Sequence, residues 1–185
     1  MNNFISVIAL FDEEGREKIE FYQDLIKETD LDNRLPHMTL AVYDEPIEVG
    51  DFLNLVDDFC KSHTGISIYV NSMRIFNQSS ICFTPILDSV LNQFYLDFHR
   101  KYKDKCRPFF SPFSESWFPH IGLMYTKLDD AKKKLTTIMD TFEDFELRIE
   151  SLRVTRKTSN GFEVVHEVKL NTTSHEVDGS SINNF

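Results

Sequence analysis

The sequence predicts an α+β fold made of two lobes that share one core. Short apolar runs rich in β-branched residues alternate with amphipathic segments at helical spacing, which indicates both strands and helices. The order helix, Pro-His strand, helix, hairpin also occurs twice along the chain. With 185 residues, the chain can form one domain or two small lobes around a shared core. We therefore expect a single bilobal domain at 1–170, with two structural units at about 14–84 and 87–170.

The first unit follows an N-terminal strand whose run FISVIALF is almost entirely apolar. A helical segment comes next, with Ile19, Tyr22 and Ile26 on one face, and Pro36 then introduces the strand HMTLAVY. A second helical segment leads into two strands that Asn77-Gln78 joins as a turn. The predicted elements are strands at 4–11, 37–43, 66–76 and 79–84 and helices at 14–28 and 49–62.

The second unit repeats this order with different residues. Its first helix carries Leu91, Tyr95 and Phe98 on one face, and the irregular stretch KCRPFFSPFSESW separates this helix from the strand HIGLMY. A further helix and a hairpin with the turn Ser159-Asn160-Gly161 complete the unit. The predicted elements are helices at 88–102 and 128–142, strands at 120–125, 145–155 and 162–170, and a flexible polar tail at 171–185.

Composition argues against several classes of protein. A net charge of −10 disfavours a protein that binds duplex DNA through its backbone, and it favours a small anion or a short nucleotide as ligand. The three cysteines include no Cys-x-x-Cys pair, so we expect neither a disulfide framework nor a thiolate zinc site. The N-terminal apolar run lacks a basic leader, and no run is long enough to cross a membrane. We therefore expect a cytoplasmic protein that does not associate with membranes.

Two near-duplicate strands carry the chemistry. Pro36-His37-Met38-Thr39-Leu40 and Pro119-His120-Ile121-Gly122-Leu123 share the pattern Pro-His-apolar-small-Leu. Because side chains alternate between the two faces of a strand, His37 and Thr39 share one face, as do His120 and Gly122. The two histidines are separated by about one structural unit. A pseudo-two-fold relation between the units therefore brings them face to face in the space between the lobes.

Two opposed imidazoles suit phosphoryl transfer. One imidazole takes a proton from the attacking oxygen while the other gives a proton to the leaving oxygen, and an unperturbed pKa of about 6.5 allows both near neutral pH. The Thr39 hydroxyl can donate a hydrogen bond to a phosphate oxygen. This scheme needs no metal ion, and we expect no cofactor. A single histidine in a strand is usually structural, but two at matching positions in duplicate strands indicate a functional pair.

The two strands, their spacing and the order of elements resemble the two-histidine (2H) phosphoesterase superfamily, which includes bacterial proteins similar to 2′-5′ RNA ligase and RNA 2′,3′-cyclic phosphodiesterase. The signature of that family is His-x-Thr/Ser-x, present twice, and His37-Met38-Thr39-Leu40 fits it fully. The segment Trp117-Phe118-Pro119-His120-Ile121 also resembles the lead-in to the second motif, and the resemblance covers residues 4 to about 170.

This resemblance implies that two antiparallel sheets form a central cleft with helices outside and the histidines within it. It also implies activity, by hydrolysis or ligation, on 2′,3′-cyclic phosphate or 2′,5′-phosphodiester bonds of RNA ends or small nucleotides. The chain departs from the signature at Gly122, which has no hydroxyl. Losing one donor that points at developing charge costs on the order of 3 kcal/mol, whereas a glycine lets a backbone amide or a bulkier ligand approach.

Three hypotheses follow. The first is an enzyme in which His37 and His120 act as the acid and base and Thr39 holds the phosphate. The second is a degenerate member that binds a nucleotide or a cyclic phosphate but turns it over poorly, as Gly122 suggests. The third is a structural protein whose histidines are incidental.

Other side chains are assigned from position alone. Tyr43 shares the alternation of His37 and Thr39 and is assigned to the cleft, with capping of the strand end as the alternative. Trp117 is the ring before the second histidine that we expect to contact a substrate. The neighbouring phenylalanines are expected to pack a loop against the core. We expect the protein to act as a monomer. Candidates for a phosphate contact are Arg74, Arg107, Arg153 and Arg156, and the histidines expected to be structural or uninvolved are His63, His99, His166 and His175.

Overall fold

The computed structural model describes residues 4–28, 35–44, 48–77, 79–159 and 161–172, and its elements follow the predicted order. The predicted tail, including His175, lies outside the described residues from position 173 onward. The elements are β1 (Phe4–Phe11), α1 (Glu13–Ile26), β2 (Met38–Asp44), α2 (Val49–Ser62), β3 (Ile66–Phe76), β4 (Ser80–Pro85), α3 (Ser89–His99), the short 3-10 helices η2 (Lys103–Lys105) and η3 (Pro108–Phe110), β5 (Ile121–Tyr125), α4 (Leu128–Met139), β6 (Phe145–Thr158) and β7 (Gly161–Lys169).

All strands belong to one antiparallel sheet with the order β1-β2-β5-β4-β3-β6-β7, and a further pairing joins β1 to β6. The long strand β6 connects two halves of this sheet, because Phe145–Ile149 pair with β3 and Ile149–Lys157 pair with β1. The α+β class is confirmed. The two expected sheets are halves of one continuous sheet, since β6 runs through both and a single bridge between Met38 and Ile121 joins β2 to β5.

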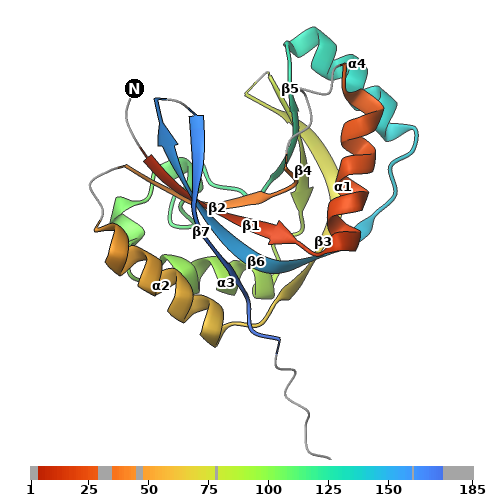
Figure 1. The fold of residues 1–185 in the computed structure, drawn as a ribbon. Helices are drawn as coiled ribbons and strands as arrows, with labels where there is room; N and C mark the ends of the chain where they lie inside the picture. Colours follow the sequence, from red (N-terminus) through yellow and green to blue (C-terminus); the bar gives the residue numbers. More distant parts are fainter. Residues whose placement is uncertain (1–3, 29–34, 45–47, 78, 160, 173–185) are drawn as a thin grey trace, which may run out of the picture.

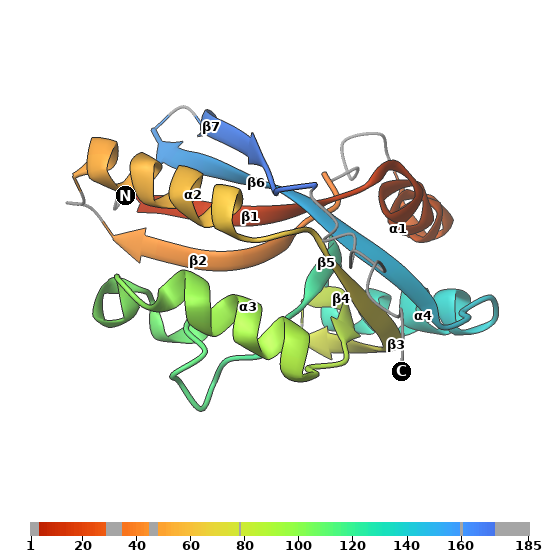
Figure 2. The same ribbon diagram turned by 90° about the horizontal axis from the view of Figure 1, so that it is seen from below.

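Helices cover only the outer face of each half (Figures 1 and 2). The first lobe consists of β1, β2, β7 and the C-terminal part of β6, with α2 and α3 outside. The second lobe consists of β3, β4, β5 and the N-terminal part of β6, with α1 and α4 outside. Each lobe therefore combines helices from both sequence units, and the lobes are not the units themselves. Among the described residues, no α-helix covers the inner face of either half.

Local sequence accounts for where α1 and α3 begin. The Asp12 carboxylate accepts a hydrogen bond from the backbone N–H of Gly15 at 3.1 Å and caps α1, and Asp88 caps α3 through the N–H of Leu91 at 2.8 Å. At the predicted hairpin turns, Asn77 has a φ of 48° and Gly161 a φ of 130°, while Gln78 and Asn160 lie outside the described residues. The value at Gly161 is one that residues with a side chain rarely adopt, so glycine is required there.

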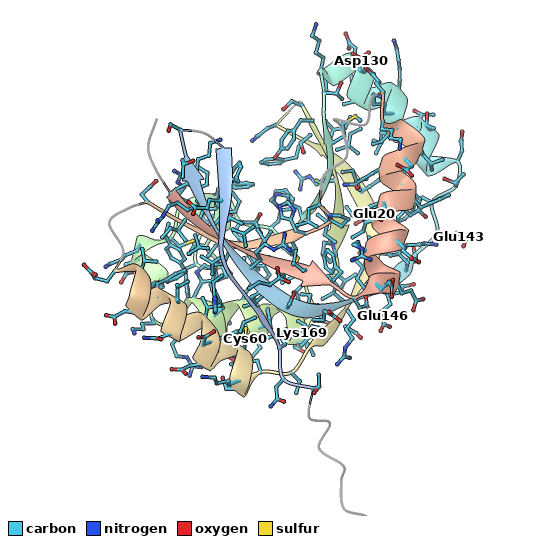
Figure 3. All side chains as sticks on the ribbon, viewed as in Figure 1. Glu20, Cys60, Asp130, Glu143, Glu146 and Lys169 are labelled. Atoms are coloured by element: carbon cyan, nitrogen blue, oxygen red, sulfur yellow. The ribbon has the colours of Figure 1, made fainter. Side chains whose placement is uncertain are left out.

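The acidic charge lies on the outside of the molecule. Figure 3 shows Glu20, Asp130, Glu143 and Glu146 around the outer side of the second lobe. The three cysteines, Cys60, Cys82 and Cys106, are buried and form no disulfide. In the part of the chain that the structure describes, no helix is both long enough and apolar enough to cross a membrane.

Candidate active site

The register between β2 and β5 brings the two Pro-His motifs together. Met38 and Ile121 pair across the two antiparallel strands, and both are fully buried on the outer face. Continuing this register by one residue on each side sets His37 opposite Gly122 and Thr39 opposite His120. These four positions share the inner face, and directly opposed residues in such a pair have Cβ atoms roughly 5 Å apart. The two histidines are therefore diagonal neighbours across the junction of the lobes.

Both imidazoles are held by the same local contact. Nδ1 of His37 lies 2.7 Å from the carbonyl oxygen of Leu35, and Nδ1 of His120 lies 3.2 Å from that of Phe118. Because a carbonyl oxygen only accepts, Nδ1 carries the hydrogen in each ring. The other nitrogen, Nε2, is then the atom that takes or delivers a proton. Each histidine is thus fixed in the tautomer that acid–base catalysis requires.

His120 lies in an aromatic environment. Its ring is 5.9 Å from that of Phe76, 5.7 Å from that of Phe109 and 5.0 Å from that of Phe118, measured between centroids. Burial lowers the pKa of His120 from its usual value, and the nearby charges of His37 and Arg74 lower it further. His120 is therefore predominantly neutral at pH 7, the state in which an imidazole can act as a base.

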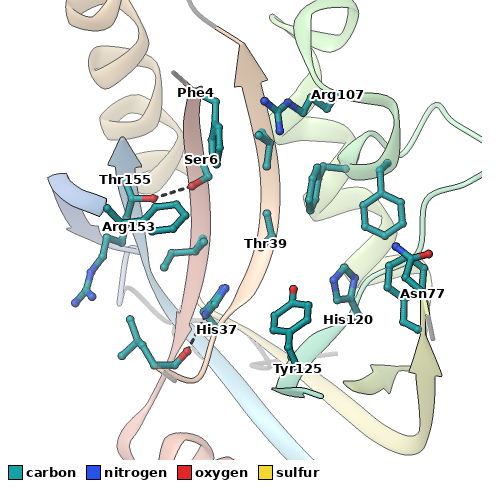
Figure 4. A pocket seen from close by; sticks show the side chains of 18 of the residues that line it. Phe4, Ser6, His37, Thr39, Asn77, Arg107, His120, Tyr125, Arg153 and Thr155 are labelled. Atoms are coloured by element: carbon teal, nitrogen blue, oxygen red, sulfur yellow. Dashed lines mark hydrogen bonds between the residues drawn. The ribbon is translucent and has the colours of Figure 1, made fainter. Parts of the chain in front are cut away.

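The histidines lie in a cleft of about 660 Å³ on the inner face of the sheet (Figure 4). This volume falls within the usual range for small-molecule sites. His37, Thr39, His120 and Gly122 all line it. Among the described residues that line the cleft, none is acidic, although the whole chain carries a net charge of −10. The cleft is therefore a place where an anion meets less repulsion than elsewhere on the molecule.

Gly122 leaves open space beside His37. A Cβ atom built on Gly122 would meet no atom within 4 Å, and the backbone there does not have the left-handed conformation that favours glycine. Neither packing nor backbone geometry therefore requires glycine at this position. The missing hydroxyl leaves room that a ligand can occupy.

Tyr43 does not line the cleft, so this prediction was wrong. Its side chain is 1% exposed and packs on the outer face, 5.3 Å from Phe52 between ring centroids, and its hydroxyl has no hydrogen-bond partner among the described residues. The cause is a β-bulge. Val7 pairs with Ala41 but Ile8 pairs with Thr39, so Leu40 is an extra residue in β2 and the alternation of faces reverses after it. Val42 takes the position in the cleft instead.

The second motif contains the same bulge. Cys82 pairs with Gly122 but Ile81 pairs with Met124, so Leu123 is the extra residue in β5. Tyr125 consequently lines the cleft at the position equivalent to Val42, and its ring is visible near the histidines in Figure 4. Strict alternation along the strand would have placed Tyr125 on the outer face, which is why sequence reasoning missed it.

Trp117 is also outside the cleft. Its ring packs edge-on against Tyr95 of α3, with the centroids 4.8 Å apart, and it contributes to the core rather than to the lining. The neighbouring phenylalanines were expected to pack a loop against the core, but Phe109 and Phe110 line the cleft. The irregular stretch before β5 therefore supplies rings to the site through the short helix η3 and not through its tryptophan.

Two of the four candidate arginines line the cleft. Arg107 hydrogen-bonds Asp44 at 2.6 Å and 3.1 Å, and Arg153 hydrogen-bonds Glu167 at 2.7 Å. Arg74 instead lies over the ring of Phe118 at 4.4 Å, and Arg156 is not among the lining residues.

Three of the other histidines are structural. His99 is fully buried and its Nε2 donates to the carbonyl oxygen of Leu40 at 2.9 Å, and burial lowers its pKa. His166 contacts Asp57 at 2.7 Å, and His63 stacks on Phe59 at 3.9 Å. Within the described residues, no group of three or more His, Cys, Asp or Glu side chains has the arrangement of a metal site.

Several lining residues come from strands that the motif analysis did not connect with the site. They include Ser6 of β1 and Thr155 of β6, whose hydroxyl groups hydrogen-bond each other at 2.7 Å. The sequence contains one signal for them, since Ser6 is the single polar residue in the otherwise apolar run FISVIALF. The others lining the cleft are Phe4, Ile8, Leu35, Phe76, Asn77, Ser79, Phe162 and Val164.

No protein-family model and no curated protein matches the chain. Solved structures do. TT0787 of Thermus thermophilus shares 14% identity at a TM-score of 0.57, covering 92% of this chain and 98% of that one. A protein described as a phosphoesterase shares 12% identity at a TM-score of 0.60, covering 91% and 98%. E. coli LigT complexed with NADP+ shares 13% identity at a TM-score of 0.58, covering 92% and 99%.

At these identities the likeness shows a shared fold, which extends over nearly the whole of each chain. The fold expected from the resemblance seen in the sequence is therefore confirmed.

Proposed function

We propose that the protein is a phosphoesterase of the two-histidine type that acts on 2′,3′-cyclic phosphate or 2′,5′-phosphodiester bonds of RNA ends or small nucleotides. The observation that carries this proposal is the matched placement of His37 and His120. Both line one cleft, and each donates Nδ1–H to the carbonyl two residues earlier. Phosphate, 3′-AMP and NADP+ complexes of E. coli LigT, which has the same fold, support a nucleotide ligand.

The proposed hydrolysis uses the two imidazoles in opposite roles. Nε2 of neutral His120 takes a proton from water as the water oxygen bonds to phosphorus. Protonated His37 gives its Nε2 proton to the ribose oxygen as the phosphorus–oxygen bond to that oxygen breaks. The lowered pKa of His120 favours this assignment. The Thr39 hydroxyl donates to a non-bridging phosphate oxygen as charge develops there. In ligation a ribose hydroxyl of a second nucleotide takes the place of water: it gives its proton to His120 as its oxygen bonds to phosphorus, while His37 protonates the ribose oxygen that leaves.

Both histidines come from one chain, so the working unit of this proposal is a monomer. We also propose that it works in the cytoplasm. Its test is turnover of 2′,3′-cyclic AMP and of a 2′,5′-linked dinucleotide by the wild-type protein, His37→Ala and His120→Ala, with and without EDTA. We expect each alanine variant to lose about 10²- to 10⁴-fold in kcat, and EDTA to have no effect. Wild-type activity retained in either variant would sink the proposal.

A second candidate is a nucleotide-binding protein with little turnover. Gly122 favours it, because a hydroxyl that would hold the phosphate is absent although space for one exists. Tight binding of 3′-AMP without detectable hydrolysis of either substrate would favour this candidate over the enzyme.

A further inference from the structure

The cleft extends well beyond the histidines along the first lobe. Across neighbouring strands, Ser6 pairs with Thr155 and Thr155 pairs with Val164, and one step further Phe4 and Phe162 both pair with Lys157. Phe4, Ser6, Thr155, Phe162 and Val164 line the same cleft as the histidine pair. With strands about 4.8 Å apart, β7 lies about 14 Å from β2. One continuous cleft therefore has two separate regions, one at the histidines and one at β1, β6 and β7.

The region of the cleft at β1, β6 and β7 has exposed aromatic and aliphatic side chains. Phe162 is 66% exposed and Val164 is 56% exposed. The rings of Phe4 and Phe162 meet edge to face, with centroids 5.9 Å apart and an interplanar angle of 69°. A single exposed apolar side chain needs no explanation, but adjoining ones that line a cleft offer a platform on which another ring can stack.

Cations and hydroxyl groups accompany these rings. Lys157 Nζ lies 4.6 Å from the centroid of Phe162, and the Arg107 guanidinium lies 4.6 Å from that of Phe4. Asp44 already hydrogen-bonds Arg107, whereas Lys157 does not itself line the cleft but lies against Phe162, which does. In the Ser6–Thr155 pair one hydroxyl donates to the other, which leaves the accepting hydroxyl with its own O–H to donate. Ring stacking, a cation and a hydroxyl donor together match a nucleoside that carries a phosphate.

The region of the cleft at the histidines has its own aromatic wall. Phe76 and Phe109 form it, and their stacked rings have centroids 4.9 Å apart. Resting on the proposed function, we propose that Phe4, Phe162 and the Ser6–Thr155 pair form a second nucleoside subsite. The cleft then takes a substrate in which a second nucleoside precedes the one that bears the reacting phosphate. Such a substrate is a dinucleotide or an RNA end with at least one further nucleotide, in preference to a mononucleoside cyclic phosphate.

The test compares two substrates that end in the same 2′,3′-cyclic phosphate, the mononucleotide 2′,3′-cyclic AMP and the dinucleotide ApA 2′,3′-cyclic phosphate. We expect wild-type protein to prefer the dinucleotide in kcat/KM by about 5- to 100-fold, the contribution of stacking one base. Phe162→Ala should abolish this preference, because it lowers kcat/KM for the dinucleotide more than for the mononucleotide. Phe113→Ala is the matched control, since Phe113 is 57% exposed but does not line the cleft.

Equilibrium binding separates this inference from the proposed function. Calorimetry with 3′-AMP and with ApA carrying a 3′-phosphate needs no turnover, so it tests the subsite even if the protein hydrolyses nothing. Tighter binding of the dinucleotide that is lost in Phe162→Ala supports the subsite. Equal binding of both ligands by wild-type protein, or an equal loss for both in Phe162→Ala, overturns it even where the histidines prove catalytic.

Discussion

Restoring a hydroxyl at Gly122 tests how the two motifs share the phosphate. Extending the single pair of Met38 with Ile121 by one residue on each side sets Gly122 opposite His37, as it sets Thr39 opposite His120. No atom lies within 4 Å of a Cβ built there, so Gly122→Thr needs no rearrangement of its neighbours. A threonine hydroxyl at this position would face the same phosphate from the opposite strand. A donor placed at developing charge is worth about 10²- to 10³-fold in kcat.

The open space at Gly122 also predicts how a larger side chain there changes the free energy of unfolding. Glycine within a strand costs roughly 0.5–1 kcal/mol in conformational entropy, and a β-branched residue suits a strand. Gly122→Thr and Gly122→Val should therefore each stabilise the fold by about 0.5–1 kcal/mol. For a domain of this size, that amounts to a rise in Tm of about 1–4 °C.

The assay pairs kcat for 2′,3′-cyclic AMP with thermal unfolding in both variants. Valine has the shape of threonine without its hydroxyl, so Gly122→Val separates the effect of filling space from that of the donor. We expect Tm to rise in both variants and kcat to rise only in Gly122→Thr. Equal kcat in the two variants would show that position 122 does not face the phosphate. A fall of several degrees in Tm in both would show that the space is not open.

Four further predictions concern residues in the cleft and behind it. Thr39→Val should lower kcat by about 10²-fold with little change in Tm, and an unchanged kcat would remove Thr39 from phosphate binding. Because the pKa of His120 is lowered, the acid limb of kcat/KM against pH should lie below pH 6.5, and a limb above pH 7 would contradict His120 as the base. Burial lowers the pKa of His99 as well, so His99 and His120 both favour the folded state above about pH 6.5. This stabilisation is lost as the pH falls through the pKa values of the two histidines in the folded protein. Urea unfolding should therefore give a lower free energy of unfolding at pH 5.5 than at pH 7.5. Tyr43→Phe removes a buried hydroxyl without a partner, so it should keep full kcat and equal or higher Tm, whereas lost activity would return Tyr43 to the cleft.

The sequence predicted the elements and the histidine pair because both depend on local patterns. Apolar periodicity gave each helix and strand to within a few residues, and the duplicated Pro-His motif indicated which two strands meet. The composition of the lobes was not predictable from this, because it depends on which helix packs against which half of the sheet. Ser6 and Thr155 adjoin only through the pairing of β1 with β6, 149 positions apart in the chain, and no local pattern encodes that contact.

The leucine that both motifs share explains why simple alternation failed at Tyr43 and Tyr125. Leu40 and Leu123 occupy the third position after their histidines, and each is the extra residue of a bulge. A bulge frees backbone carbonyls from the ladder, and a buried carbonyl without a partner is costly. In β2 the helix α3 supplies the partners, since the Tyr95 hydroxyl donates to the carbonyl of Thr39 at 3.0 Å and His99 donates to that of Leu40. A helix of the second unit thus fixes the backbone beside the Thr39 hydroxyl of the first, so the geometry of the site depends on both units together.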